Sequence, residues 1–176
     1  MKIKIGIGLL LLFCNIVLAQ NNCKCKKDSI RYATAYNYIV KDSKYKIWVS
    51  DSICDLEGSA FYSDLKDYYP KIKEKMQQYW IDNDFIGIKP FYSSCIASIF
   101  KKKESAADNM LFFSLIRDRV LVAEIYPLDR NNPYIKNNIL YEHHEICRFT
   151  TGLYYLFIFN KDNTIKTVFK HTVFCD

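Results

Sequence analysis

The sequence LYYLFIFNKDNTIKTVFKHTVF, residues 153–174, contains the clearest structural pattern in the chain. Two runs rich in aromatic and β-branched residues flank a polar tetrapeptide, residues 160–163, which is typical of a β-hairpin. The first run, residues 153–159, is apolar at every position. We therefore expect a central strand that is covered on both faces.

The second run alternates, so the two faces of its strand differ. Ile165, Thr167, Phe169, His171 and Val173 share one face, and the other face holds two lysines and a threonine besides Val168 and Phe174. We expect this strand to be half exposed, with His171 on the core side as a buried, hydrogen-bonded residue. Such a sheet needs helices or a second sheet to cover it.

Further elements are predicted before this hairpin. Apolar residues recur at helical spacing in residues 32–40, after a cap at Asp28 or Ser29, and again in residues 72–80, after Pro70. Residues 51–67 are predicted to be an ordered connection without an assigned element, and residues 95–100 to be either strand or helix. We expect strands at 45–50, 110–116 and 119–126, a turn at Arg117-Asp118, and a short third helix within 139–147.

These elements predict an α+β fold, in which two to three helices pack on a mostly antiparallel sheet with a C-terminal β-hairpin. A helix followed by a curved antiparallel sheet resembles the layout of cystatin-like and nuclear-transport-factor-like domains. The likeness is one of layout without a shared motif, and it implies no function. Residues 20–176 are expected to form a single compact domain.

Residues 1–19 follow the pattern of a cleaved signal peptide. Lys2 and Lys4 precede an apolar run, and Val17-Leu18-Ala19 fits the small-residue cleavage rule, so we expect export to the periplasm, cell envelope or medium. The apolar run is shorter than the ~20 residues of a membrane helix, so no membrane span is expected after cleavage. The alternative is a lipid anchor on Cys14, although Phe13 stands where bacterial lipoproteins carry Gly or Ala.

Cysteine usage predicts a disulfide framework. An even number of cysteines in an exported chain favours disulfides, here up to three, and no metal site is predicted because Cys23-x-Cys25 lacks a second close pair of ligands. Cys23 and Cys25 are too close to bond each other without strain, and Cys175 is the preferred partner for this N-terminal arm. The candidates are Cys23, Cys25, Cys54, Cys95, Cys147 and Cys175.

Charge and glycine content exclude several function classes. Loss of the leader lowers the formal net charge from +6 to +4, and the basic residues are scattered, so no nucleic-acid partner is expected. The five glycines, two of them in the leader, form no phosphate-binding loop, so no cofactor is predicted.

The segment Glu142-His143-His144-Glu145 holds the densest group of reactive side chains. It makes His143, His144 and Glu145 the candidate catalytic residues of a small secreted hydrolase. Adjacent histidines on a helix point about 100° apart and cannot both face one metal ion. The alternative is a solvated turn or short helix beside a disulfide-bonded Cys147.

The 14 tyrosines indicate either a binding surface or simple packing of the sheet. Residues 67–70 and 90–92, where aromatics stand beside a proline, are the candidate surfaces for a protein or carbohydrate partner. The leading hypothesis is an exported, disulfide-stabilised binding or interaction module with no evident catalytic site. No oligomeric state is predicted.

Overall fold

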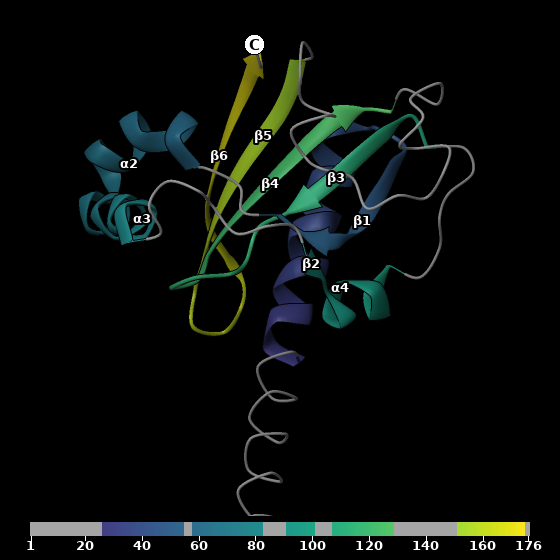
Figure 1. Ribbon diagram of the computed structural model, residues 1–176, viewed down its shortest axis with the longest axis horizontal. Helices are drawn as coiled ribbons and strands as arrows, with labels where there is room; N and C mark the ends of the chain where they lie inside the picture. The colour runs from purple at the N-terminus through teal and green to yellow at the C-terminus, as the bar shows by residue number, and fades with distance from the viewer. Residues whose placement is uncertain (1–25, 55–57, 83–90, 101–106, 129–150, 175–176) are drawn as a thin grey trace, which may run out of the picture.

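A computed structural model describes residues 26–54, 58–82, 91–100, 107–128 and 151–174. Its centre is a six-stranded sheet with the strand order β2-β1-β3-β4-β5-β6. All neighbouring strands are antiparallel except β1 and β3, which run parallel. The strands are β1 Ile47–Ile53, β2 Phe91–Tyr92, β3 Asn109–Phe113, β4 Val120–Pro127, β5 Thr151–Phe159 and β6 Ile165–Phe174 (Figure 1).

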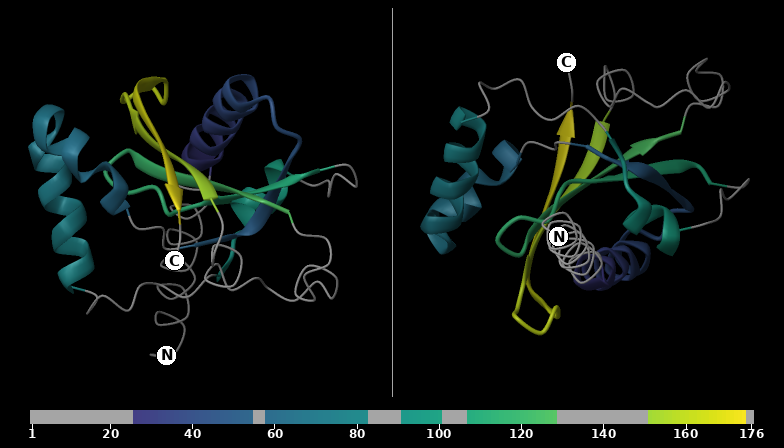
Figure 2. Two further views of the ribbon diagram at one scale, coloured as in Figure 1. Left: turned by 90° about the horizontal axis from the view of Figure 1, so that it is seen from above. Right: turned by 60° about the horizontal axis from the view of Figure 1, so that its bottom comes forward.

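Helices cover both faces of this sheet, which confirms the predicted α+β class. The N-terminal helix, residues 26–43, and α4, Ser94–Ile99, pack on one face. The 3-10 turn η1, Gly58–Phe61, with α2, Tyr62–Tyr68, and α3, Pro70–Asp82, packs on the other. Figure 2 shows the N-terminal helix and the α2–α3 pair well separated, with the β5–β6 hairpin between them.

Two apolar cores result, one on each side of the sheet. Alternate residues of β3, β4 and β5 enter opposite cores because successive side chains of a strand point to opposite faces. The first core joins Tyr32, Ala35 and Ile39 of the N-terminal helix to Leu111, Phe113, Tyr155 and Phe157. The second joins Phe61 and Leu65 to Phe112, Val122, Leu156 and Ile158.

The predicted hairpin is present as β5 and β6, and its first strand is covered on both faces as expected. β5 does not lie at the middle of the sheet, however. It is next to the edge strand β6, and β4 lies on its other side. Helices on both faces, rather than a central position, account for its burial.

The edge strand β6 is half exposed, as predicted, but one of its residues faces the unexpected side. Its pairing with β5 is irregular at Lys166. Because such a bulge reverses the faces of the residues before it, Ile165 packs on the first core, while Phe169 and Val173 pack on the second. The prediction that Ile165 shares a face with Phe169 is therefore wrong.

The β3–β4 hairpin turns one residue later than predicted. Arg117 and Val120 exchange both backbone hydrogen bonds, with N···O distances of 3.0 and 2.6 Å. Between them, Asp118 and Arg119 have φ angles of 47° and 69°. Positive φ at both central residues is the signature of a type I′ turn, whose twist matches that of the two strands.

Three other segments are assigned by the structure. β1 begins two residues later than predicted and extends to Ile53. The stretch predicted as a connection contains η1 and α2, and residues 95–100 lie mostly in a helix, α4. Ser93 caps α4, because its Oγ accepts a hydrogen bond from the backbone N–H of Ile96.

Gly152 in β5 is required by close packing. A Cβ atom at this position would lie 2.6 Å from ring carbons of both Tyr126 and Tyr154. A Cβ at Gly58 would instead meet the flexible end of Met76.

We predict that Gly152→Ala lowers the free energy of unfolding by about 1–3 kcal/mol, because two packed rings must shift. Gly58→Ala is the matched control and should cost less, since a methionine end moves to another rotamer at low cost. Urea denaturation followed by circular dichroism measures both. An equal or smaller loss for Gly152→Ala would contradict the packing argument.

Candidate functional site

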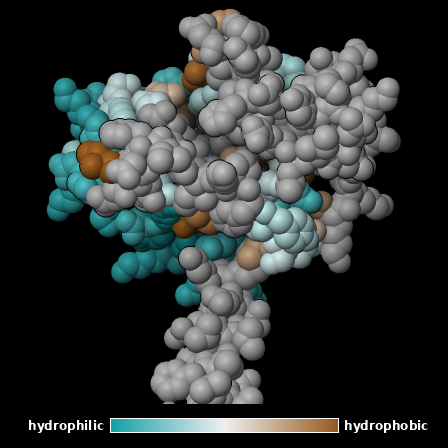
Figure 3. Space-filling model, in the orientation of Figure 1, coloured by the Kyte–Doolittle hydropathy of each residue, from teal (hydrophilic) through white to brown (hydrophobic). Residues whose placement is uncertain are grey.

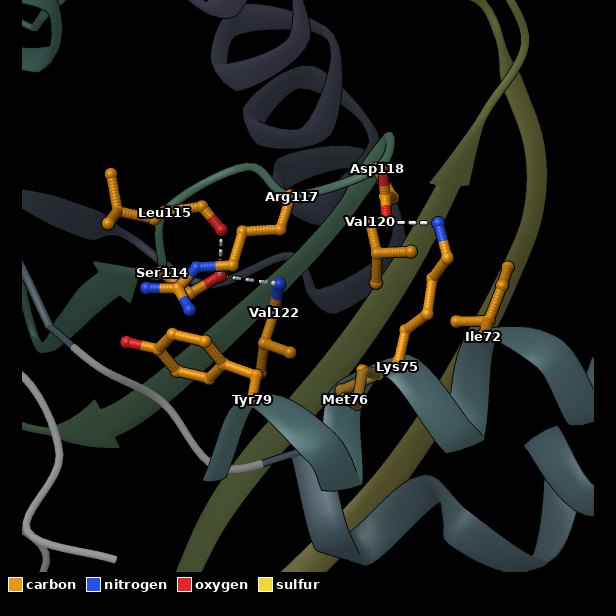
Figure 4. Close-up of a pocket in the computed structure, with 10 residues that line it drawn as sticks. All are labelled: Ile72, Lys75, Met76, Tyr79, Ser114, Leu115, Arg117, Asp118, Val120 and Val122. Carbon is orange, nitrogen blue, oxygen red and sulfur yellow. Dashed lines mark hydrogen bonds and ion pairs between the residues drawn. The ribbon is translucent and has the colours of Figure 1, made fainter. Parts of the chain in front are cut away.

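A pocket of about 230 Å³ lies between α3 and the β3–β4 hairpin. We call it the α3–hairpin pocket. Figure 4 shows its lining residues, which come from two parts of the chain about 40 residues apart. From α3 come Ile72, Lys75, Met76 and Tyr79, and from the hairpin come Ser114, Leu115, Arg117, Asp118, Val120 and Val122.

The apolar walls of the pocket follow from the spacing of apolar residues along α3 and β4. On α3, Ile72, Met76 and Tyr79 recur at i, i+4 and i+7, so they share the face that points to the sheet. On β4, Val120 and Val122 are two residues apart and therefore lie on one face. The pocket thus has an aliphatic floor with a tyrosine at one side.

A β-bulge shapes the hairpin side of the pocket. Ser114 pairs with Val122, donating its backbone N–H to the Val122 carbonyl at 2.9 Å. Its Oγ accepts the backbone N–H of Val122, also at 2.9 Å. Because Arg117 already pairs with Val120, Leu115 and Ile116 together oppose the single residue Leu121. The extra residue bends this strand beside the end of α3.

Charged side chains form the rim. Lys75 Nζ lies 2.7 Å from Asp118 Oδ2, with side chains 65% and 62% exposed, and this ion pair joins α3 to the turn. The guanidinium carbon of Arg117 lies 3.2 Å from the centroid of the Tyr79 ring, a cation–π contact (Figure 4). An ion pair so exposed adds at most about 1 kcal/mol to stability.

The size of the pocket limits what it holds. Pockets for drug-sized ligands have volumes of about 300–1,000 Å³, and a water molecule occupies about 30 Å³ of liquid. The α3–hairpin pocket therefore accommodates roughly eight groups of that size, such as a phenyl ring with a short alkyl stem.

A second polar group, around Glu124, is buried. Among the described residues, Glu124 is the one charged residue that is almost fully buried, at 2% exposure. The Tyr126 hydroxyl donates a hydrogen bond to Glu124 Oε2 at 2.6 Å and lies 2.5 Å from the Tyr154 hydroxyl. Burial and the neighbouring Glu124 raise the pKa of Tyr126, which keeps its hydroxyl protonated as a donor. With so little exposure, we interpret this cluster as structural.

His171 lies on the core side of β6 and is hydrogen-bonded, as predicted, but it is not fully buried. Its side chain is 38% exposed, and its Nε2 lies 2.6 Å from Asp64 Oδ2 on α2. Its ring contacts Phe61, with centroids 5.1 Å apart. β6 is an edge strand, and at this point it contacts η1 and, through Asp64, α2, so His171 sits at the rim of the second core.

Asp42 connects the N-terminal helix to the β5–β6 hairpin. Its Oδ2 accepts hydrogen bonds from Lys170 Nζ at 2.6 Å and from the Tyr155 hydroxyl at 2.8 Å. The Lys170 ammonium and the Tyr155 hydroxyl hold the pKa of Asp42 below its usual value. These contacts fix the C-terminal end of the helix on the sheet.

Several residues predicted as functional lie outside the described part of the chain. They are His143, His144 and Glu145, the leader with Cys14, and Cys23, Cys25, Cys147 and Cys175. Of the other cysteines, Cys54 is a buried thiol. Cys95 lies in α4.

The tyrosines of the two candidate surfaces differ in their exposure. Tyr68 and Tyr92 are largely exposed, whereas the Tyr69 hydroxyl lies 2.6 Å from Thr167 Oγ1 on β6. Figure 3 shows mainly hydrophilic residues over α2 and α3, and the hydrophobic residues on this face are scattered. Tyr69 therefore packs at the rim of the sheet, and the neighbouring Tyr68 is exposed.

Two features are absent from the described residues. No helix there is both long and apolar enough to cross a membrane. No three His, Cys, Asp or Glu side chains in those ranges are grouped so as to hold a metal ion.

Comparisons of the chain with protein-family models, curated proteins and solved structures found no match. The α3–hairpin pocket therefore has to be interpreted from its own geometry. Sequence reasoning missed it, although the spacing of Ile72, Met76 and Tyr79 and the basic residues Lys75 and Arg117 were visible as separate signals.

The structural interpretation of the Glu124 cluster is testable. We predict that Tyr126→Phe lowers the free energy of unfolding by about 1–3 kcal/mol, because it removes a buried hydrogen bond to a carboxylate. Tyr155→Phe, the matched control, loses its bond to the partly exposed Asp42 and should cost about 1 kcal/mol or less. Urea denaturation compares the two, and a smaller loss for Tyr126→Phe would contradict this assignment.

Proposed function

We propose that this protein is an exported binding module whose ligand inserts an apolar group into the α3–hairpin pocket. The observation that carries the proposal is the pocket itself, which has an aliphatic floor, an aromatic side and a rim of charged residues. A few polar groups around an apolar hollow are the usual composition of a ligand site.

The lining residues support binding better than catalysis. Among those described, Asp118 is the one carboxylate, and it is already paired with Lys75 at 2.7 Å. General acid–base chemistry needs a titratable group placed toward the reacting atoms, and none of the described lining residues is a histidine or a glutamate. The hydrolase at His143, His144 and Glu145 and the lipid anchor at Cys14 stay alternative predictions.

Export and disulfide bonding belong to the same proposal. The signal pattern of residues 1–19 and the even number of cysteines after it support it.

We predict that the neutral probe 3-phenylpropan-1-ol binds in the pocket and shifts the methyl NMR signals of Met76, Val120 and Val122. Ile72→Trp should weaken this binding by about tenfold or more, since the larger side chain fills the hollow. Ile81→Trp is the control, because Ile81 is exposed on α3 and does not line the pocket. Unshifted methyl signals, or equal weakening by both variants, would refute the site.

The intact mass of protein recovered from its native host tests export and disulfides together, with and without reduction and alkylation. We expect a chain that begins at Gln20 and contains at least one disulfide. A mass that matches the uncleaved chain with every thiol alkylated without reduction would overturn both parts.

A further inference from the structure

We infer that the edge strand β6 binds an extended, acidic segment of another protein, which adds to the sheet beside it. In the described part of the chain, β6 has ten residues and β5 as its one neighbour (Figure 1). The outer side of such a strand presents backbone donors and acceptors that an added strand can pair with. No described lining residue of the α3–hairpin pocket belongs to β6, so this surface goes beyond the proposed function.

The hydrogen bonds of β5 show which of its residues face β6. The N–H of Phe159 donates to the Arg119 carbonyl at 2.9 Å, on the β4 side. The N–H of Asn160 donates to the Thr164 carbonyl at 2.9 Å, on the β6 side. Because the backbone groups of successive residues in a strand point to opposite sides, the even-numbered residues from 152 to 158 also face β6.

The register then identifies the outward groups of β6. The residues that pair with this even-numbered set are Thr167, Phe169, His171 and Val173, so their backbone groups point to β5. The residues between and after them point away from the sheet. We call their outward N–H and C=O groups the β6 edge, which consists of Val168, Lys170, Thr172 and Phe174.

Two lysines of β6 require explanation, because lysines on an edge strand commonly prevent strand addition. Both are engaged with other parts of this chain. Lys170 Nζ lies 2.6 Å from Asp42 Oδ2 on the N-terminal helix, and Lys166 Nζ lies 5.0 Å from the centroid of the Tyr69 ring, between α2 and α3. Each ammonium is therefore held toward an element on one face of the sheet.

The charges beside the strand favour an acidic partner. Asp42 largely neutralises Lys170, whereas no carboxylate among the described residues pairs with Lys166. An acidic side chain on an added strand complements Lys166. A second copy of this chain would instead bring its own two lysines to the shared pair of strands, and like charges on adjacent strands are destabilising.

An exposed aromatic residue lies on one face of the same strand. Tyr68 is 71% exposed, and its ring centroid lies 6.2 Å from that of Phe169. Phe169 packs on the second core, and an added strand turns every second side chain to this same face. An apolar side chain there contacts Tyr68. The partner segment thus alternates apolar residues with others that include Asp or Glu.

The test uses random nonapeptides displayed on phage and selected on the purified, oxidised protein. We expect the selected peptides to alternate apolar residues and to exceed the library in Asp and Glu content. Synthetic copies should slow amide hydrogen exchange at the four residues of the β6 edge. The amides of Phe169, His171 and Val173 should change less, because they already bond to β5.

Thr172→Pro tests the edge itself, because it removes one outward N–H and no bond to β5. We expect it to weaken binding of the synthetic peptides by about fivefold or more. Thr172→Ala is the matched control, since Thr172 is exposed and alanine keeps the N–H, and it should bind within about twofold of the parent. Near-ultraviolet circular dichroism verifies the fold of both variants.

A second measurement leaves the protein unchanged. Peptides N-methylated at one position at a time should lose binding at every second position, because only alternate N–H groups of an added strand face β6. Effects without this period of two would overturn the inference, as would equal binding to Thr172→Pro and Thr172→Ala, or no selected peptide above the library background.

The remaining outcomes concern the identity of the partner. An excess of Lys and Arg in the selected peptides would overturn the acidic assignment. Self-association in sedimentation equilibrium, with protection of the β6 edge amides that rises with protein concentration, would assign the edge to a second copy and overturn the inference. Ile72→Trp, which fills the α3–hairpin pocket, should leave peptide binding unchanged, so failure of the pocket and failure of the edge are observed separately.

Discussion

The apolar character of both faces of β4 and β5 is the constraint on which the rest of this structure depends. Nearly every side chain of these two strands is buried. Each face must therefore be covered by a separate element, and the chain supplies the N-terminal helix on one side and η1, α2 and α3 on the other. The buried Glu124 is the exception on β4, and it is tolerated because Tyr126 donates a hydrogen bond to it.

The α3–hairpin pocket arises where this cover is incomplete. The bulge at Leu115 and Ile116 and the type I′ turn bend the tip of the β3–β4 hairpin beside α3. At this point α3 reaches the hairpin through polar contacts, the Lys75–Asp118 ion pair and the stacking of Arg117 on Tyr79. Long side chains bridge a gap that apolar ones do not fill, so the hollow and its charged rim have one common cause.

Local patterns in the sequence predicted most of the fold. Two-residue alternation and helical spacing located both hairpins, the N-terminal helix and α3, because these patterns report directly which face of an element is buried. Errors arose where a bulge or a sheet edge intervened. Ile165 changed faces through the irregularity at Lys166, and His171 proved half exposed because β6 is an edge strand. Neither a bulge nor an edge position changes the alternation of residue types in the sequence, so neither could be predicted from it.

The pocket could not be predicted in the same way, because its walls combine residues from α3 with residues of a hairpin about 40 positions later. Single-sequence reasoning favours reactive residues that stand together, such as His143 and His144, and it overlooks side chains that only the fold brings together. In the sequence, Lys75 and Asp118 look like ordinary surface residues. In the fold, the β3–β4 turn places Asp118 Oδ2 2.7 Å from Lys75 Nζ.

The apolar floor and the charged rim contribute to binding in different ways. Burial of a phenyl group contributes about 2–3 kcal/mol, part of which is offset by the loss of ligand freedom. An isolated ligand of this size therefore binds weakly, at about millimolar concentrations. The Lys75–Asp118 pair at the rim is exposed, so water screens its charges and it changes the affinity little. Under the proposed function, the apolar floor therefore supplies most of the binding free energy.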